Sequence, residues 1–521
     1  MTTRLGPGGR PLPSPRGHRP KPLVAALLSA VVPGLGHLYA GDRKRAWWCI
    51  GITAVFVVPA AVLFAMVFYV TGVDLALDLA RPFFEKPGLL IALLAVNFIL
   101  VAFRAAVVVD SFMYARNLAP DDRPIILFGL SFGVALILIA TAIPHGWVGE
   151  RNLALHDLLT HDFTTDPNQV TTTTAAPTTT RPAPTIPGAT TTSTTTPPAT
   201  TTTTRPDPFE GEDRVNVLLL GSDAGPGRTG VRTDTMIVVS IDSETGWTAM
   251  FSIPRNFVRT PIPADHPAYS EWPDGLWGDP SNLVWGIYAY GLQNPALFDG
   301  ANTGGDAAKT IFGHLVGLEI DYFAMVNLHG FVDMIDALGG VEIQVTRRIY
   351  DAEYPHEDGY LIEIEFLPGT YRMNGHDALA FARTRHDADD FDRMGRQRCV
   401  LEALAREADP VSLLRELPSL VPAIESSVIT DIPVARFPDF LSLLAKVDTE
   451  QIVSMRFIPN APEFAGTLTS YVAYQVEGYN VPNVDLIRDR VQIATTLPPL
   501  EAAEALNLQP LDEVCGMPDG D

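Results

Sequence analysis

Residues 214–242 read RVNVLLLGSDAGPGRTGVRTDTMIVVSID. The first part, 214–221, is a nearly continuous apolar run that ends in Gly-Ser-Asp, which is typical of a buried strand followed by a turn. Residues 235–242 are rich in Val and Ile and predict a second strand. A third strand is predicted over 248–253. This part of the chain therefore begins a sheet.

Helices and strands are predicted to alternate downstream of these strands. The helices are expected over 306–318, 330–338, 376–382 and 393–408, and the strands over 322–327 and 341–345. Such alternation predicts a layered α/β domain with a mixed central sheet, which we place at residues 211–460. The Pro-punctuated remainder, 461–521, is predicted to be a C-terminal tail.

The first third of the chain is dominated by apolar runs. Three of them are long enough to cross a bilayer as helices: 46–72, 88–109 and 124–144. Residues 23–147 are therefore predicted to be a membrane region. A shorter run, 23–41, contains Pro33, Gly34 and Gly36 and has basic residues on both sides. We expect it to form a re-entrant or interfacial hairpin, with a fourth spanning helix as the alternative.

Positive charge predicts the topology. Residues 1–22 carry five Lys or Arg residues and no acid, so this segment is expected to lie in the cytoplasm. Three spans then place everything after residue 145 outside the cytoplasm. Residues 164–210 are mostly Thr and Pro and are predicted to be a disordered linker, because they hold too few apolar groups to offset the entropy of ordering. The domain at 211–460 is thus expected to be extracytoplasmic.

Charge and cysteine content exclude several classes of protein. The net charge of -23 argues against a nucleic-acid partner, which would need clustered Lys and Arg. Three cysteines are too few for a disulfide scaffold. Cys399 and Cys515 lie on the expected extracytoplasmic side, where disulfides persist, so we predict that they pair. Cys49 lies in a predicted membrane helix and is expected to be inert.

Two aspartates follow or begin neighbouring strands. Asp223 comes directly after the strand at 214–221, and Asp234 stands where the next strand begins. Ligand sites in α/β proteins collect at strand ends. Two carboxylates there can share a hard cation such as Mg²⁺, which takes oxygen ligands and keeps waters for a phosphate. The alternative interpretation is that both are turn or cap residues.

Arginines are concentrated in one short segment of this acidic chain. Residues 383–398 contain five of them, and Arg255 follows the strand at 248–253. Arginine binds phosphate oxygens bidentately and stays charged. In a helix, Arg393 and Gln397 share a face because they are four residues apart. The alternative is a salt-bridged surface, since Asp387, Asp389, Asp390 and Asp392 lie among the arginines.

Together, two aspartates and several arginines suit a pyrophosphate. The sequence has no GxxxxGK[ST] loop, so a P-loop nucleotide site is not supported. The segments RVNVLLLGSD, VRTDTMIVVSID and TAMFSIPR, followed by GFVDMIDALGGVEIQV and GTYRMNGHDALAFARTRHDADDFDRMGRQR, resemble the LytR-CpsA-Psr (LCP) family. The resemblance covers about residues 214–460, and the preceding membrane anchor agrees with it.

The resemblance implies both a fold and an activity. The implied fold is an α/β/α domain, with helices on both faces of the sheet and an apolar lipid groove. The implied activity is an extracytoplasmic phosphotransferase that takes a glycopolymer from a polyprenyl-pyrophosphate carrier in the membrane and joins it to peptidoglycan by a phosphodiester. Ordinary core packing is favoured over a groove for Phe323, Val326, Phe331 and Met334.

The resemblance also implies roles for individual residues. Asp223 and Asp234 would hold Mg²⁺ or Mn²⁺. Asp390 would be the base for the attacking hydroxyl. The residues that would bind the pyrophosphate are Arg232, Arg255, Arg383, Arg385, Arg393 and Gln397. The arginines in this set would also be catalytic. The chain departs from the family pattern at Asn256, where an acid is usual.

Two other functions stay open from the sequence. A non-catalytic cell-wall regulator or sensor would keep the arginines to bind polyprenyl-linked polymer but would need no metal, so the Asp223–Asp234 pair argues against it. A lipid pyrophosphatase would use the same site with water as the acceptor. The residues do not separate hydrolysis from transfer.

Overall fold

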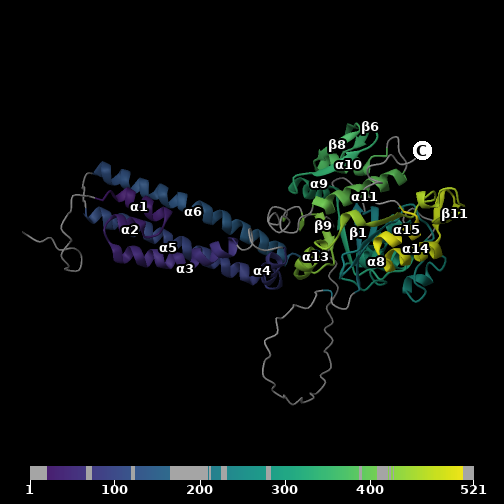
Figure 1. Ribbon diagram of the computed structural model, residues 1–521, viewed down its shortest axis with the longest axis horizontal. Coiled ribbons are helices and arrows are strands. Elements are labelled where there is room, and N and C mark those ends of the chain that lie inside the picture. Colours follow the sequence, from purple (N-terminus) through teal and green to yellow (C-terminus); the bar gives the residue numbers. More distant parts are fainter. Residues whose placement is uncertain are drawn as a thin grey trace, which may run out of the picture. The chain divides into compact units, whose positions relative to one another are not determined.

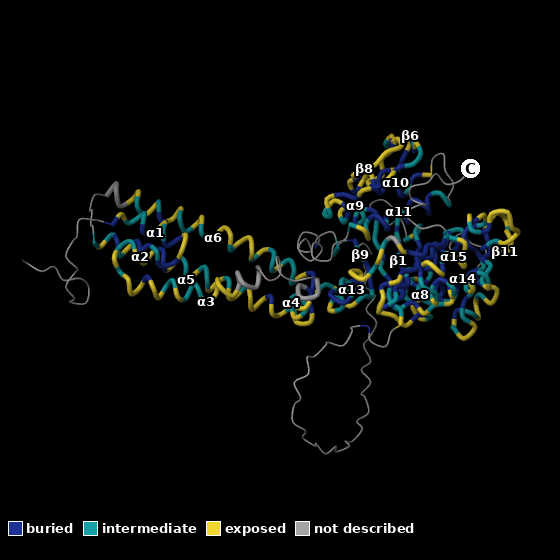
Figure 2. Tube along the Cα trace, viewed as in Figure 1, coloured by how far each residue is buried: buried dark blue, intermediate teal, exposed yellow. Residues whose placement is uncertain are grey.

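The computed structural model describes residues 20–65, 73–118, 124–164, 209, 213–223, 231–276, 283–385, 390–407, 421, 424–425 and 427–508. The chain divides into two compact units (Figures 1 and 2). The first unit comprises 1–161, 409–421 and 433–442. The second comprises 162–408, 422–432 and 443–521.

The first unit is helical. Its helices are α1 (Pro22–Val31), α2 (Leu35–Tyr39), α3 (Arg43–Ala65), α4 (Val73–Glu85), α5 (Gly88–Leu118) and α6 (Pro124–Thr160). Two helices in the described residues are long and apolar enough to cross a membrane, 88–118 and 128–160, and little of either is buried. Large apolar side chains such as Trp48, Phe98 and Phe128 are exposed on α3, α5 and α6. Figure 2 shows the exposed stretches along these helices. Such a surface suits contact with lipid.

The predicted hairpin at 23–41 folds as two short helices. The 10-residue helix α1 is about 15 Å long, half the thickness of a bilayer core of about 30 Å. The turn before α2 includes Gly34, whose φ of 103° lies in the left-handed region that glycine tolerates. Helix α1 packs through Ala26 and Ala30 on Val108 and Phe112 of α5.

Two segments of this unit differ from prediction. Residues 73–85, which lie between the predicted spans 46–72 and 88–109, form the helix α4. It packs Phe84 against Leu90 and Leu159 and against Phe437 of α13 (Phe437–Leu444). The apolar residues of α4 face one side only, so no long apolar run marks it in the sequence. Helix α6 continues past the predicted end at 144 to Thr160, with Pro144 inside it. Proline can lie inside a long helix and kink it without ending it.

The second unit is built on a six-stranded mixed sheet with the order β10-β3-β2-β1-β4-β9. The strands are β1 (Arg214–Ser222), β2 (Thr233–Asp242), β3 (Thr248–Ser252), β4 (Tyr322–Val326), β9 (Val428–Thr430) and β10 (Val453–Arg456). β1 pairs antiparallel with β2 and parallel with β4, and β3 pairs antiparallel with β2 and parallel with β10. The predicted mixed sheet is confirmed.

Helices cover both faces of this sheet. Successive residues of a strand point to opposite faces. Met236 and Val238 of β2 therefore join the main core with α7 (Ile287–Gln293), α8 (Thr303–Val316) and α14 (Val484–Thr496). Ile237 points to the other face and packs with Leu401 of α11 (Asp390–Glu407). The α/β/α arrangement follows from this alternation.

A smaller second core adjoins α11. Its strands form two antiparallel pairs, β5 (Val341–Val345) with β8 (Gly369–Met373) and β6 (Ile349–Pro355) with β7 (Leu361–Phe366). Its helices are α9 (Leu328–Ala337) and α10 (Gly375–Arg383). Figure 1 shows β6, β8, α9 and α10 grouped at one side of the second unit. Ile343 and Phe381 pack here with Val400 of α11, so α11 is shared by both cores.

The tail predicted over 461–521 is wrong for its first part. Residues 472–506 form β11 (Val472–Val476), β12 (Tyr479–Pro482), α14 and α15 (Pro499–Leu506). Ile487 of α14 is fully buried in the main core. The prolines that suggested a tail end β12 at Pro482 and start α15 at Pro499, positions where proline does not disturb secondary structure.

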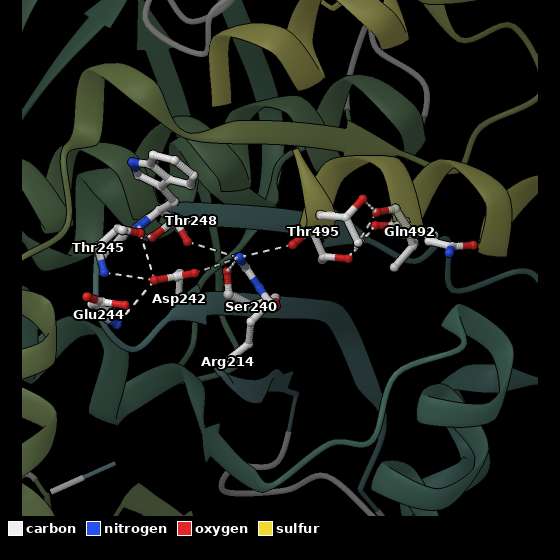
Figure 3. Close-up of polar contacts among 12 residues, drawn as sticks. Arg214, Ser240, Asp242, Glu244, Thr245, Thr248, Gln492 and Thr495 are labelled. Carbon is white, nitrogen blue, oxygen red and sulfur yellow. Dashed lines mark hydrogen bonds and ion pairs between the residues drawn. The ribbon is translucent and has the colours of Figure 1, made fainter. Parts of the chain in front are cut away.

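Polar contacts also join α14 to the sheet (Figure 3). Arg214, at the start of β1, donates from Nε to Ser240 Oγ (2.8 Å) and from Nη1 to the Thr495 carbonyl (3.2 Å). The Asp242 carboxylate accepts hydrogen bonds from the backbone and the hydroxyl of Thr245, both at 2.7 Å. The chain segment after residue 461 is therefore an integral part of the domain.

The segment before the predicted linker is fixed as well. The carbonyl of Phe163 accepts a hydrogen bond from the Thr430 backbone (2.9 Å), and Asn302 Nδ2 donates to the Thr164 carbonyl (2.7 Å). The rest of the predicted linker, apart from Phe209, lies outside the described residues.

The folded C-terminal segment yields a stability prediction. Ile487→Ala removes a fully buried side chain and should cost about 2–5 kcal/mol of folding free energy. Thermal unfolding of the full chain in detergent, followed by circular dichroism, should show a lower midpoint. The matched control is Leu500→Ala on the exposed side of α15, which should have little effect. Equal midpoints for both variants would mean that α14 is not part of the core.

Candidate active site

A cavity of about 130 Å³ lies at the ends of β1 and β4. It is lined by Leu219, Leu220, Gly221, Ser222, Asp223, Asp234, Thr235, Val326, Asn327, Leu328, Phe331, Leu379, Ala382, Arg383, Arg393, Gln397, Val400 and Leu401. Five of the predicted site residues are among them: both aspartates, two arginines and the glutamine. The cavity therefore joins charged groups to an apolar wall.

The aspartates reach the cavity from adjacent strands. Asp223 follows β1, and its Oδ1 accepts the backbone N–H of Arg232 (3.1 Å), while its own N–H donates to the Arg232 carbonyl (3.0 Å). Asp234 lies in β2, beside the register shift of β1 at Gly221 and Ser222. A β-bulge of this kind re-aims nearby side chains. Both residues line the same cavity.

Asp234 is surrounded by arginines from three segments. Arg255, which follows β3, donates from Nη1 to Asp234 Oδ1 at 2.6 Å. Arg385 Nη2 lies 3.7 Å from Asp234 Oδ2. Arg393 of α11 donates from Nη1 to the Asp234 backbone carbonyl at 3.1 Å, and its side chain is 1% exposed. The fold therefore brings together arginines separated by up to 138 residues in sequence.

These arginines control the charge of Asp234. Burial raises the pKa of this carboxyl, but the charge and hydrogen bond of Arg255, with the charges of Arg393 and Arg385, outweigh it. The pKa of Asp234 is therefore lowered from its ordinary value, and the group is an anion at neutral pH. An ionised carboxylate is the form that binds a divalent cation.

The other predicted residues occupy different positions around the cavity. Arg383 at the end of α10 lines the cavity, donates from Nη1 to the Pro355 carbonyl (2.7 Å) and lies 5.8 Å from the ring of Tyr354. Arg232 is exposed, lies 5.0 Å from the ring of Trp285, and is not among the cavity-lining residues. Asp390 is the first residue of α11, and its side chain lies outside the described residues.

Two arginines of the 383–398 segment have structural contacts. Arg396 donates from Nε to the Phe381 carbonyl (2.7 Å) and from Nη2 to the Thr384 carbonyl, so it holds the end of α10. Arg398 donates to Ser454 Oγ of β10 (2.8 Å). Helix α11 thus places Arg393 and Gln397 at the cavity, whereas Arg396 and Arg398 bind other elements of the fold.

The apolar wall was only partly anticipated. Of four residues considered for a groove, Val326 and Phe331 line the cavity, whereas Phe323 is buried in the main core and Met334 is not in the lining. The sequence reasoning missed Leu219, Leu379, Val400 and Leu401. A signal existed in α11, because residues 393, 397, 400 and 401 share one helix face.

Cys399 on α11 is disulfide-bonded, and Cys49 on α3 is a free thiol. Cys515, the predicted partner of Cys399, lies outside the described residues. The pairing of these two residues therefore stays a prediction.

Comparison with known proteins gives several matches. The model of the LytR_cpsA_psr family matches residues 185–484. The polyisoprenyl-teichoic acid–peptidoglycan teichoic acid transferase TagU of Bacillus licheniformis is 29% identical over 226 residues, which cover 43% of this chain and 62% of TagU. The regulatory protein MsrR of Staphylococcus aureus is 29% identical over 229 residues, covering 43% of this chain and 59% of MsrR. The chain thus matches about three fifths of the length of these curated relatives.

Solved structures also align with this chain. The crystal structure of B. subtilis TagV aligns with 57% of this chain and 99% of that chain, at 21% identity and a TM-score of 0.39. A structure described as TagT bound to LIIa-WTA aligns with 55% of this chain and 92% of that chain, at 21% identity and a TM-score of 0.39.

The contacts separate structural arginines from site arginines. Arg396→Ala leaves two carbonyls at the end of α10 without their donor and should cost about 1–3 kcal/mol of stability. Arg385→Ala removes an exposed side chain and should change the unfolding free energy by less than about 0.5 kcal/mol. Both variants lose one positive charge, so thermal unfolding of the pair isolates the contacts. A larger loss in Arg385→Ala would contradict this assignment.

Proposed function

The chain belongs to the LytR_cpsA_psr family, whose model matches more than half of its length, and from this premise we propose that it is a membrane-anchored phosphotransferase. It would transfer a glycopolymer from a polyprenyl-pyrophosphate carrier to peptidoglycan through a phosphodiester bond. The observation that carries the proposal is the cavity in which Asp223, Asp234, Arg383 and Arg393 meet an apolar wall. A pyrophosphate joined to a lipid chain likewise combines a charged group with an apolar one.

The arginines would bind and orient the pyrophosphate. Its negative charge would be met by Arg383 and Arg393, which line the cavity, and by Arg255 and Arg385, which already contact Asp234. Phosphoryl transfer depends on positioning and on charge stabilisation more than on covalent participation of the protein. Gln397, one turn from Arg393, would donate a further hydrogen bond. Arg232, above Trp285, would contact the part of the substrate outside the cavity.

In the proposed reaction, a hydroxyl oxygen of the peptidoglycan acceptor attacks the phosphorus that carries the glycopolymer. The bond between this phosphorus and the bridging oxygen breaks, and the polyprenyl monophosphate leaves with the bonding electron pair. The hydroxyl proton passes to a base, for which Asp390 is our proposal. The site arginines would hold the phosphate oxygens as the charge of the leaving group develops.

The donor set of the aspartate pair fits Mg²⁺ or Mn²⁺. Both residues line the cavity, and Asp234 is kept ionised by its arginines. We therefore propose Asp223 and Asp234 as the ligands of such a cation, which, when bound, would neutralise charge on the phosphate oxygens.

Location follows from the helices of the first unit. We propose a multi-pass anchor with a cytoplasmic N-terminus and an extracytoplasmic catalytic domain. An ion pair between Arg81 of α4 and Asp439 of α13 supports this topology. Asp439 follows all predicted spans in the chain, so α4, between two spans, must lie on the same side as the residues after α6. If the N-terminus is cytoplasmic, this condition requires the segment that contains α4 to face outward.

The activity can be tested with the full chain in detergent and a lipid-pyrophosphate glycan. We expect release of the lipid monophosphate, loss of release in EDTA, and recovery with added Mg²⁺. Arg393→Gln should reduce the rate by about 100-fold or more, because it removes a buried charge from the phosphate site. The matched control is Arg348→Gln, whose ion pair with Glu365 lies outside the cavity. Lipid binding without release would favour a regulator over an enzyme.

The acceptor separates transfer from hydrolysis. With peptidoglycan fragments present, the glycopolymer phosphate should become linked to the fragment, as detected by mass spectrometry. Asp223→Asn should reduce linkage and release together, because one phosphate site serves both. Release that leaves the glycopolymer phosphate unlinked at every fragment concentration would mean that water is the acceptor and the protein is a pyrophosphatase.

A further inference from the structure

A second group of metal-ligating side chains lies in the smaller core region. His356 and Glu357 occupy the turn between β6 and β7, and His376 stands in the first turn of α10. One ligand atom from each lies within 4.8 Å of the other two. None of the three lines the phosphate cavity. Our function proposal gives them no role.

The geometry centres on the Glu357 carboxylate. Its Oε1 contacts His376 Nδ1 and lies 3.5 Å from His356 Nε2. The Glu357 side chain is 2% exposed, and His356 is also buried, whereas the His376 side chain is 51% exposed. The imidazoles stack with ring centroids 5.1 Å apart. The cluster is thus closed toward the protein and open at His376.

Burial of this carboxylate calls for a positive partner. An ionised carboxylate is costly to bury unless it is paired or bound to a metal. Two protonated imidazoles stacked at this distance would repel each other. One divalent cation can neutralise the Glu357 carboxylate and accept a lone pair from an imidazole nitrogen of each histidine.

The surroundings supply the outer contacts that metal-binding histidines usually have. Asp358 Oδ2 lies 3.5 Å from His356 Nδ1, and Asp358 Oδ1 lies 3.1 Å from His329 Nε2. The Asp358 backbone N–H donates to His356 Nδ1 (3.3 Å), and His356 Nε2, on the side of Glu357, lies 3.3 Å from the Tyr360 hydroxyl oxygen. Tyr360 stacks on His356 with ring centroids 4.3 Å apart. These contacts fix the ring orientation.

The backbone of the turn is fixed as well. The His356 N–H donates to the Tyr360 carbonyl, and the Gly359 N–H donates to the His356 carbonyl, both at 2.9 Å. Gly359 has a φ of 90°, which a residue with a Cβ rarely adopts. The turn therefore presents His356 and Glu357 as a preformed pair toward His376.

We propose that His356, Glu357 and His376 bind a divalent transition-metal ion of the zinc class. Two imidazole nitrogens and one carboxylate oxygen suit Zn²⁺ or Co²⁺ and differ from the all-oxygen pair Asp223 and Asp234. Three protein ligands leave a fourth position for water or another donor. Exposure of His376 provides the entry path.

The site has a structural link to the phosphate cavity. The residue before His356 is Pro355, whose carbonyl accepts the hydrogen bond from Arg383 Nη1. A metal that ties the β6–β7 turn to α10 would hold both sides of this contact, because Arg383 is the last residue of α10. The metal would thus brace the position of a site arginine.

The test measures Co²⁺ binding, which needs no enzymatic turnover. Full-length protein without a histidine tag is stripped with a chelator, dialysed and titrated with Co²⁺. The wild type should bind one ion with visible d–d absorption of a four- or five-coordinate site, and excess Zn²⁺ should abolish the absorption. His376→Ala and Glu357→Gln should each weaken binding at least 100-fold. His376 is half exposed, so its loss should leave the fold intact, which circular dichroism checks.

Controls separate this site from the proposed catalytic cation. Asp223→Asn should keep the Co²⁺ absorption, even if the protein proves to have no transferase activity. His329→Ala, which removes one of the two histidine contacts of the Asp358 carboxylate, should weaken binding by about 10-fold or less. Unchanged binding in both His376→Ala and Glu357→Gln, or no Co²⁺ absorption in the wild type at millimolar metal, would overturn the proposal and leave the cluster as a set of hydrogen-bonded side chains.

Discussion

The site depends on the interaction of the Asp234 carboxylate with the arginines around it. Arginines that converge on one cavity repel each other, and this repulsion opposes folding unless an anion lies among them. Asp234 supplies that anion: it accepts from Arg255, lies near Arg385, and presents its backbone carbonyl to the buried Arg393. The cluster is therefore organised before substrate arrives. The pyrophosphate substrate that we propose would meet donors already in place, which would lower the cost of orienting them.

Helix α11 transmits this organisation to both cores. Its Leu401 packs on the sheet, its Val400 packs in the smaller core, and Arg393 reaches β2. Arg396 holds the end of α10, which carries Arg383. One helix therefore sets the distance between the aspartates on the sheet and the arginine on α10. The parts of the site thus share one scaffold element.

The sequence predicted the parts of the fold that have strong periodicity. The strands at β1, β2 and β5 and the helices α8 to α11 were found because their apolar residues recur with the period of a single element. The segment 472–506 was missed because its strands are short and prolines mark their ends. The β6–β7 hairpin was also missed, although alternation in LIEIEF at 361–366 was visible.

Residue roles within the arginine segment were less predictable than the segment itself. Arg393 and Arg396 are three residues apart on one helix, and the sequence alone does not predict which of the two side chains faces a cavity. That choice is made by the packing of α11 against two cores, which is a tertiary property. Leu401 packs on the sheet and lines the cavity together with Arg393 and Gln397 on the same face of α11.

The two proposed cation sites answer different physical needs. The aspartate pair lies where a hard cation could meet phosphate oxygens, so its ligands are oxygens and its neighbours are arginines. The histidine cluster lies at a hairpin turn and does not line the phosphate cavity. It is next to the Pro355 carbonyl that accepts a hydrogen bond from Arg383. A two-stranded hairpin is only marginally stable by itself. A metal bond between the turn and α10 would restrict the turn and so keep Arg383 aimed at the cavity.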